Sequence, residues 1–359
     1  MGKYDKDRHQ KELAIRYCLA QGMSPCLEVV VASASDLSDT SEVLTDIDVL
    51  GLEFLADGGF RRIIFDCKTT NKMSPINRAF WAAGILAYSG CDEAFVILKN
   101  NAVYNHRLSA LTIGVDLHDE ASFEDLGNSR DIGFNADNNY QSSIDRWNTL
   151  FDVYCKNPWS ESLFLTGHNA VPLSLQPWRI FRRLVAEFRS ARGHLDPVKD
   201  GHLAIFLDVM AAIFVLWSSI GRDVRRFYSP KMTKNDFEKA LRYYIWGGKE
   251  SYQIRQEIRQ KTAQTGATQD FPSWEKLLSF AGLVVAGPHE LFGCVNICRE
   301  MSLRALSGRL ESQEKRLALM LSINKRARQF IMAASDYMID ACGLPTDMRT
   351  RIQNELTSP

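Results

Sequence analysis

Two patterns of apolar residues divide the chain. In the first third, short apolar runs alternate with polar turns; beyond residue 143, apolar residues recur with the 3.6-residue period of helices. The elements predicted for the first part are, in order, a helix over residues 5–21, a strand over Leu27–Ser33, a hairpin over residues 45–70, a helix that begins at Ser74-Pro75, a strand over Glu93–Lys99, and a helix or a strand over Arg107–Val115.

The second part of the chain is predicted to be mostly helical. Its periodic segments cover residues 177–193, 201–228, 233–247, 273–286, 289–306 and 311–342. Residues 126–143 are rich in Gly, Asn, Asp and Ser, which favours a linker. We therefore expect an α/β domain over residues 1–127, a linker over 128–143, and a mostly α-helical domain over 144–359.

One helical segment is apolar enough to resemble a membrane span. Leu203–Ile220 approaches the required length, but Asp208 lies in its interior and no other segment supports a membrane topology. A helix buried in an all-α domain explains the segment better, and Asp208 would then need a partner such as a nearby arginine. We expect no membrane association.

The cysteines and the N-terminus bear on the cellular compartment. Eight cysteines are scattered and mostly lie in apolar runs, and the N-terminus is highly charged without a signal peptide. Reduced cysteines and a cytoplasmic location are the expectation. His289, Cys294 and Cys298 do not predict a zinc site, because no Cys-x-x-Cys pair accompanies them.

The predicted hairpin carries the candidate chemistry. Alternate residues of a strand share a face, so Asp66 and Lys68 point the same way and Cys67 points opposite. With Asp57-Gly58-Gly59 as a three-residue loop, Asp48 pairs with Lys68; a two-residue loop would oppose Asp48 to Cys67. We expect the three-residue loop, or a bulge that restores its parity, so that two carboxylates and an ammonium converge.

Such a group has two interpretations. Two close carboxylates suit a hard divalent cation such as Mg²⁺, and a nearby lysine can orient a water or stabilise charge on a phosphate. The alternative is a surface hairpin with an Asp–Lys ion pair, which is common and contributes little stability. The full arrangement, with a helix, a strand, an Asp at an apolar run, a turn and an Asp-x-Lys strand, favours the chemical interpretation.

At these residues the chain resembles the PD-(D/E)XK nuclease superfamily over its first third. Asp48 corresponds to the aspartate of the first motif strand, and Asp66 and Lys68 correspond to the acidic-x-Lys motif. The resemblance implies that Glu12, in the first helix, completes the catalytic set and that the Cys67 carbonyl also faces the metal. Glu28 is an alternative to Glu12, although its flanking valines favour an outward-facing strand residue.

The resemblance implies a restriction endonuclease-like fold for the first domain. It further implies a Mg²⁺- or Mn²⁺-dependent nuclease that hydrolyses phosphodiester bonds, a DNA endonuclease in the first place, and by analogy a role in antiviral defence against foreign DNA. Two alternatives stay open. One is a catalytically inactive nuclease fold that serves as a binding or scaffold subunit of a larger complex, and the other is an RNA nuclease.

Charge is distributed unevenly along a chain whose formal net charge is zero. Residues 1–150 hold 14 Lys and Arg against 22 Asp and Glu, and residues 151–359 hold 29 against 21. A basic second half suits a domain that holds nucleic acid, DNA above all, or that contacts a second copy or a partner protein of a defence or repair complex. The candidate nucleic-acid contacts are Arg222, Arg225, Arg226, Arg182, Arg183 and Arg78.

Overall fold

The computed structural model describes residues 6–33, 42–69, 73–262 and 271–357. The chain forms two compact units. The first consists of Met1–Leu55, Phe60–Val153 and Leu306–Arg316, and the second of Ala56–Gly59, Tyr154–Ala305 and Leu317–Pro359. Residues 128–143, predicted as a linker, lie inside the first unit, and so does the distant segment Leu306–Arg316.

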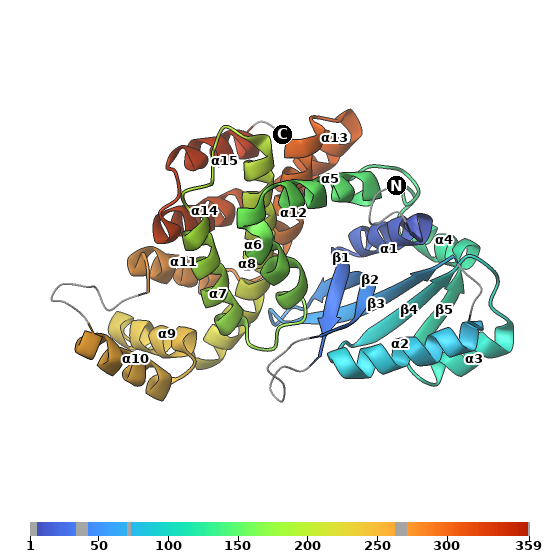
Figure 1. Ribbon diagram of the computed structural model, residues 1–359, viewed down its shortest axis with the longest axis horizontal. Helices are drawn as coiled ribbons and strands as arrows, with labels where there is room; N and C mark the ends of the chain where they lie inside the picture. Colours follow the sequence, from blue (N-terminus) through green and yellow to red (C-terminus); the bar gives the residue numbers. More distant parts are fainter. Residues whose placement is uncertain (1–5, 34–41, 70–72, 263–270, 358–359) are drawn as a thin grey trace. The chain divides into compact units, whose positions relative to one another are not determined.

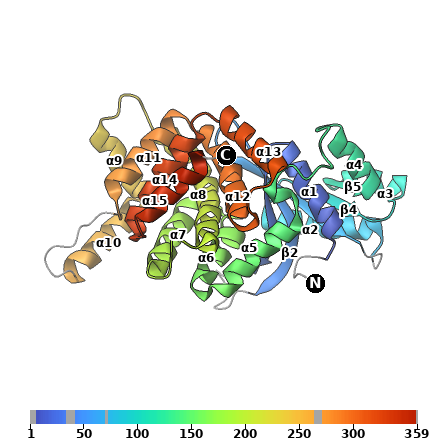
Figure 2. The same cartoon turned by 90° about the horizontal axis from the view of Figure 1, so that it is seen from above.

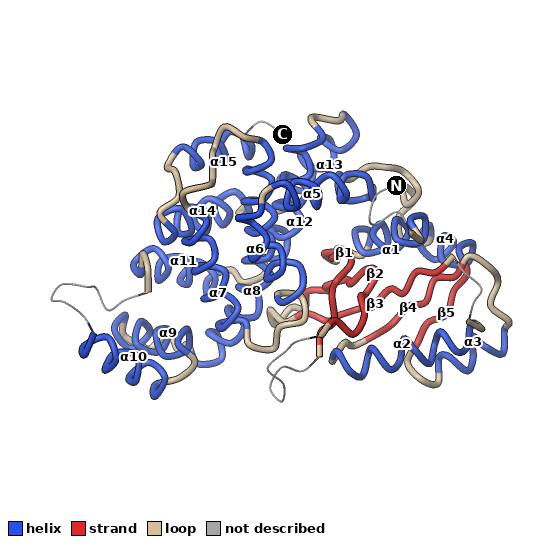
Figure 3. The backbone as a smooth tube through the Cα atoms, viewed as in Figure 1, coloured by secondary structure: helices blue, strands red, loops and turns tan. Residues whose placement is uncertain are grey.

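The first unit contains a five-stranded mixed sheet with the strands in sequence order. The strands are β1 (Ser24–Ala32), β2 (Val43–Phe54), β3 (Phe60–Lys68), β4 (Glu93–Leu98) and β5 (Val115–Asp119). The pairs β1–β2 and β2–β3 are antiparallel, and the pairs β3–β4 and β4–β5 are parallel. Figure 3 shows the strands of this sheet in red.

Helices cover both faces of this sheet (Figures 1 and 2). The helices are α1 (Arg8–Ala20), α2 (Pro75–Ser89), α3 (Tyr104–Leu111) and α4 (Glu120–Asn128). On the face of α1 and α4, the Tyr17 ring contacts the rings of Phe65, Phe95 and Phe123 at centroid distances of 5.9, 5.6 and 5.2 Å. The odd-numbered residues at the centre of the β2–β3 hairpin are buried on this apolar face, as the alternation predicts; they are Ile47, Val49, Ile63, Phe65 and Cys67.

The described elements after the sheet are helical. They are η2 (Tyr140–Ser142), α5 (Ile144–Lys156), η3 (Pro158–Ser160), α6 (Glu161–Phe164), the π-helical turn η4 (Leu165–Ala170), α7 (Pro177–Ala191), α8 (Asp200–Phe227), α9 (Lys234–Trp246), α10 (Lys249–Thr262), α11 (Trp274–Ala286), α12 (Glu290–Ser307), α13 (Glu311–Ile323), α14 (Ala327–Cys342) and α15 (Asp347–Thr357).

Helix α8 is the apolar segment noted in the sequence. Among the described helices it alone is long and apolar enough to cross a membrane by itself, and 94% of its most apolar window is buried inside the protein. Helices α11 and α12 pass the same test only as a pair bent by 116°.

The buried carboxylate of α8 has the partner expected from its sequence. Asp208 accepts hydrogen bonds from the Tyr154 hydroxyl at 2.7 Å and pairs with His168 Nε2 at 2.8 Å and with Arg299 Nε at 2.9 Å. The prediction that Asp208 needs an arginine is therefore confirmed. Burial acts to raise the pKa of Asp208, but the charges of Arg299 and His168 outweigh it and lower the pKa to about 2.

Most of the predicted helices and strands are confirmed, but the predicted set lacks several elements that the structure contains. The helix predicted over 5–21 is α1, its first residue lying outside the described residues, and Ser74 accepts a hydrogen bond from the Asn77 amide at the start of α2. Residues 311–342 form two helices, α13 and α14, and not one. The predictions missed β5 and helices α4, α5, α6, α10 and α15. Of these, β5, α4 and α6 are short and α10 and α15 are strongly polar, whereas α5 is an amphipathic helix of 13 residues.

Candidate functional site

The hairpin of β2 and β3 places its three polar residues on one face. Its register runs from Val49↔Phe65 to Phe54↔Phe60 and, extended by one residue, sets Asp48 opposite Asp66. The loop therefore spans residues 55–59. The predicted three-residue loop and the pairing of Asp48 with Lys68 are wrong, but the parity is right, because the register moved by an even number of residues.

Lys68 joins the two carboxylates. Its Nζ donates to Asp48 Oδ2 at 2.7 Å and lies 3.5 Å from Asp66 Oδ1. The Cys67 amide also donates to Asp48 Oδ2, at 2.9 Å, while the Cys67 side chain is buried on the opposite face. Asp48 and Asp66 are buried, with exposed fractions of 6% and 2%. The convergence of Asp48, Asp66 and Lys68 expected from the sequence is therefore present.

Arg78 of α2 holds the second carboxylate. Its Nε and Nη2 donate to the two oxygens of Asp66, and its guanidinium lies 4.0 Å from the Trp81 ring centroid. Burial raises the pKa of Asp66, while the hydrogen bonds from Arg78 and the charge of Lys68 act to lower it. Arg78, predicted as a nucleic-acid contact, thus contributes its charge to this site.

Lys11 of α1 is one of two members of the site that the sequence interpretation missed, the other being Asp7. Its side chain is 3% exposed, and its Nζ pairs with Glu28 and lies 3.5 Å from Asp48 Oδ1. Burial acts to lower the pKa of Lys11, but the carboxylates of Asp48 and Glu28 raise it. The available signal was helical spacing: Lys11 falls on the stripe of Ala14, Ile15 and Cys18, where a charge needs a partner.

Glu28 lies in β1 between residues that pair regularly with β2. The pairing passes from Leu27↔Val49 to Val29↔Ile47, and Glu28 between them has a left-handed backbone with φ 54°. Its side chain is only 15% exposed. Burial raises the pKa of Glu28 to about 7, and Lys11 acts in the opposite direction. The expected outward-facing strand residue is therefore a member of the charged group.

Asp7 closes the group beside Lys68. Its Oδ1 accepts hydrogen bonds from the Thr69 amide at 2.7 Å and from the Thr69 hydroxyl, and its Oδ2 lies 3.9 Å from Lys68 Nζ. We call the whole set the charged cluster. It comprises four carboxylates and three cations, namely Asp7, Glu28, Asp48, Asp66, Lys11, Lys68 and Arg78.

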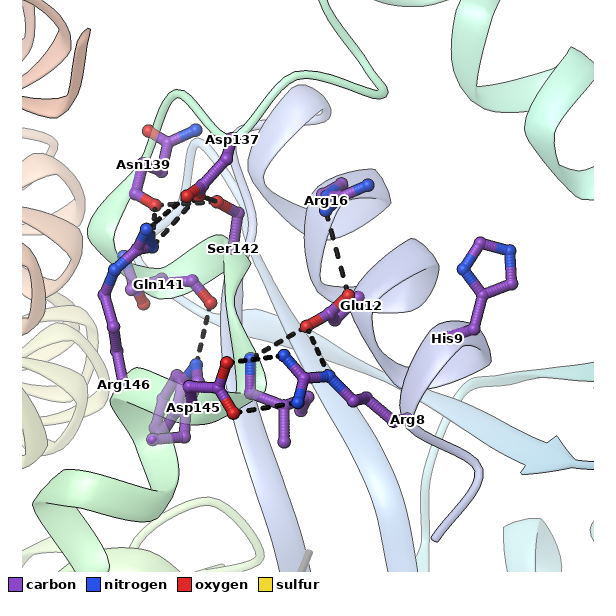
Figure 4. Close-up of polar contacts among 12 residues, drawn as sticks. Arg8, His9, Glu12, Arg16, Asp137, Asn139, Gln141, Ser142, Asp145 and Arg146 are labelled. Atoms are coloured by element: carbon purple, nitrogen blue, oxygen red, sulfur yellow. Dashed lines mark hydrogen bonds and ion pairs between the residues drawn. The ribbon is translucent and has the colours of Figure 1, made fainter. Parts of the chain in front are cut away.

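Glu12 has other partners, which Figure 4 shows. It accepts hydrogen bonds from Arg8 Nε at 3.3 Å and from the Ile144 amide at 3.1 Å, and Arg16 lies 3.9 Å away. Arg8 also donates to both oxygens of Asp145 at 2.8 and 2.7 Å. The structure does not bring Glu12 together with Asp48, Asp66 and Lys68. The i, i+4 spacing of Arg8, Glu12 and Arg16 was the signal for this alternative.

The start of α5 is held by a second polar group in Figure 4. Arg146 pairs with the Asp137 carboxylate and donates to the Asn139 carbonyl at 3.0 Å, and the Ser142 hydroxyl donates to Asp137 at 2.5 Å. The Trp147 indole donates to the Gln141 carbonyl at 2.8 Å. These contacts fix the backbone at the start of α5, where the Ile144 amide donates to Glu12. We therefore interpret Glu12 as a structural link between α1 and α5.

The basic residues predicted to bind nucleic acid lie in the second unit, apart from Arg78. Arg222 and Arg226, at the end of α8, lie 3.3 and 3.9 Å from Asp223, and Arg225 is exposed. Arg183 pairs with Glu187 at 2.7 Å. Arg182 lies between the rings of Trp178 and Trp246, at 5.0 and 5.1 Å from their centroids.

The donor set of the charged cluster can be compared with the needs of a divalent cation. Within the described residues, no group of three or more His, Cys, Asp or Glu side chains is arranged to hold a metal ion. However, Mg²⁺ is often held by one or two carboxylates with water and substrate oxygens. Asp48 and Asp66 both reach one ammonium nitrogen, so both can approach a single cation. The two carboxylates therefore match the number of protein ligands that such an ion takes, and the ion would compete with Arg78 for Asp66.

Comparisons of the chain with protein-family models, with curated proteins and with solved structures found no match.

Proposed function

We propose that the protein is a metal-dependent nuclease that hydrolyses phosphodiester bonds, acting on DNA in the first place, and that its first unit is of the PD-(D/E)XK type. The observation that carries the proposal is the shared contact of Asp48 and Asp66 with the Lys68 ammonium. A mixed sheet with helices on both faces, and a motif hairpin ending in Asp-x-Lys, is consistent with that fold.

Each residue has a role in this proposal. Asp48, Asp66 and the Cys67 carbonyl would hold Mg²⁺ or Mn²⁺, which would supply a water of lowered pKa and neutralise charge on the phosphate. Burial acts to lower the pKa of Lys68, but Asp48 and Asp66 outweigh it and raise the pKa. Lys68 therefore stays protonated, and we assign it to orienting the water and stabilising the phosphate charge, not to removing a proton.

The test is cleavage of a panel of nucleic acids. Linear, circular, branched and single-stranded DNA, and RNA, are incubated with the protein in Mg²⁺, Mn²⁺, Ca²⁺ or chelator. We expect cleavage in Mg²⁺ or Mn²⁺ only, with 5′-phosphate and 3′-hydroxyl ends. Cleavage of RNA alone would assign the same site to an RNA nuclease, and 3′-phosphate ends would require a different mechanism.

Variants connect the activity to the site. Asp66→Asn and Lys68→Ala should each lower the rate by about a hundredfold or more, because each removes a metal ligand or the charge beside the phosphate. Glu53→Gln is the matched control, since Glu53 is a β2 carboxylate whose partner, Arg61 at 2.8 Å, lies outside the charged cluster. Full activity of either folded site variant would refute the assignment.

A second candidate is a nucleic-acid-binding subunit without turnover. This candidate is favoured because protein cations already neutralise the two carboxylates. Arg78 engages both oxygens of Asp66, while Asp48 is engaged by Lys11 and Lys68. In this case the protein would bind DNA equally well in chelator and in Mg²⁺, and no substrate of the panel would be cleaved. Metal-dependent cleavage that Lys68→Ala abolishes would exclude this candidate.

A further inference from the structure

The second unit contains a pocket lined with arginines. It has a volume of about 390 Å³ and is formed by α7, by Trp246 at the end of α9, by Arg255 of α10, and by Phe271 and Pro272. Figure 1 labels the three helices. The guanidinium groups at the pocket belong to Arg179, Arg182, Arg183, Arg189 and Arg255.

Four of these arginines have no acidic partner among the described residues. Arg183 is paired with Glu187, whereas Arg179, Arg182, Arg189 and Arg255 form no ion pair with any residue that the structure describes. Arg182 is the most enclosed, and its buried Nε has no hydrogen-bond partner. Burial and the charges of Arg255 and Arg179 lower the pKa of Arg182. Within the described residues, positive charge is thus concentrated without a matching negative charge, and an anionic ligand would supply that charge.

Aromatic rings hold the guanidinium groups in place. Arg182 lies over Trp178 and Trp246, and Arg255 lies 5.2 Å from the centroid of Trp246. The Trp178 ring packs against Gly247, where a Cβ would approach it to 2.5 Å, so a larger residue at 247 would displace the ring. Such contacts preorganise Arg182 and Arg255 for a ligand and lower the entropy lost on binding.

We propose that this pocket binds a nucleoside polyphosphate. Four positive charges without an acidic partner in the described part of the chain match the three to four negative charges of such a ligand, whereas a single inorganic phosphate would leave most of them unpaired. Trp246, Phe271 and Pro272 offer an apolar surface for the base. The volume lies within the range of about 300–1,000 Å³ of small-molecule sites.

The shape of the site favours a compact ligand over a nucleic-acid duplex. Arginines that follow a phosphate backbone form a stripe over a surface, whereas these five, four on α7 and one on α10, line a single pocket. The proposal goes beyond the nuclease function and does not depend on it, because its residues belong to the second unit and those of the charged cluster to the first.

Calorimetry on the full-length protein tests the proposal, with ATP, GTP, tripolyphosphate, inorganic phosphate and adenosine as probes. We expect ATP or GTP to bind with a dissociation constant at least tenfold below that of tripolyphosphate, because the base adds contacts, and adenosine not to bind. Absence of nucleotide binding at low salt would overturn the proposal. So would tight binding of a 5′-phosphorylated single-stranded oligonucleotide without binding of free nucleotide, which would assign the pocket to a strand end.

Two variants on one helix separate the pocket from general electrostatics. Arg255→Ala and Lys249→Ala each remove one positive charge from α10, but only Arg255 lines the pocket, and both side chains are exposed, so folding should be preserved. Arg255→Ala should weaken nucleotide binding about tenfold or more, and Lys249→Ala less than twofold. Equal effects of the two variants would overturn the proposal in favour of non-specific attraction.

Discussion

The ammonium of Lys11 lies 3.5 Å from the carboxylate of Asp48, with the side chain of Lys11 almost fully buried. Successive residues of a helix are turned by about 100° about its axis, so the next residue, Glu12, faces different partners. Helix α1 therefore contributes a cation to the charged cluster, where the family resemblance implied a carboxylate. This relationship changes what substitutions in α1 should do.

Replacement of Lys11 should destabilise the first unit strongly. Lys11→Met leaves Glu28 and Asp48 with one cation fewer in a buried place, so we expect a loss of about 3–5 kcal/mol in the free energy of unfolding, measured by urea denaturation. The double variant Lys11→Met/Glu28→Gln should recover part of the loss, because the second change removes the stranded charge. Lys6→Met, at an exposed position, should stay within about 0.5 kcal/mol of wild type.

Replacement of Glu12 should affect stability more than activity. Glu12→Gln weakens its bonds to Arg8 and to the Ile144 amide, so we expect a loss of about 1 kcal/mol in the free energy of unfolding. If the protein cleaves nucleic acid, the rate should change less than twofold. A loss of a hundredfold in a folded variant would return Glu12 to the catalytic set.

The raised pKa of Glu28 predicts a dependence of stability on pH. Glu28 keeps its proton up to pH about 7 in the folded state but only up to about 4.5 in the unfolded state. The contribution of this proton to the free energy of unfolding is therefore complete below pH 4.5 and is lost as the pH rises through 7. Glu28→Gln keeps the neutral form at every pH. Its stability relative to wild type should therefore increase by up to about 3 kcal/mol between pH 4.5 and 8. Parallel stability curves would contradict the assignment, and Glu53→Gln serves as the control.

Arg78 and a metal ion should compete for Asp66. Arg78→Ala leaves a carboxylate that is 2% exposed without its bidentate partner, so we expect a lower melting temperature in chelator. If Asp66 is a metal ligand, Mg²⁺ should raise the melting temperature of the variant more than that of wild type, because the ion replaces the missing charge. Equal shifts in the two proteins would argue against metal binding at Asp66.

The buried ion pair of α8 should hold the helical unit together. Asp208→Asn leaves the Arg299 guanidinium without its charge partner and should cost about 3–5 kcal/mol, read as faster hydrogen exchange of the α8 amides. Because the pKa of Asp208 is lowered to about 2, its contribution is present above pH 3.8 and disappears as the pH falls through 2. The difference in stability between wild type and the Asp208→Asn variant should therefore shrink in acid. Asp152→Asn, at an exposed carboxylate, is the control.

The sequence by itself determined the features that depend on local periodicity. Alternation along β2 and β3 separates the apolar face of Ile47, Val49 and Phe65 from the polar face of Asp48, Asp66 and Lys68, whatever even shift the register takes. The long amphipathic and apolar helices of the second unit follow from the same kind of pattern, as does the need of Asp208 for a cation.

The tertiary structure alone decided which charges meet. The register of the hairpin depends on a loop of residues 55–59. Besides Lys68, the charged partners of Asp48 and Asp66 are Lys11 of α1 and Arg78 of α2, which lie on other elements. Periodicity reports which face of an element is buried, but it does not report which elements pack together. Packing places Lys11, Glu28 and Arg78 in the charged cluster and gives Glu12 other partners, and the periodicity of the sequence could not show either result.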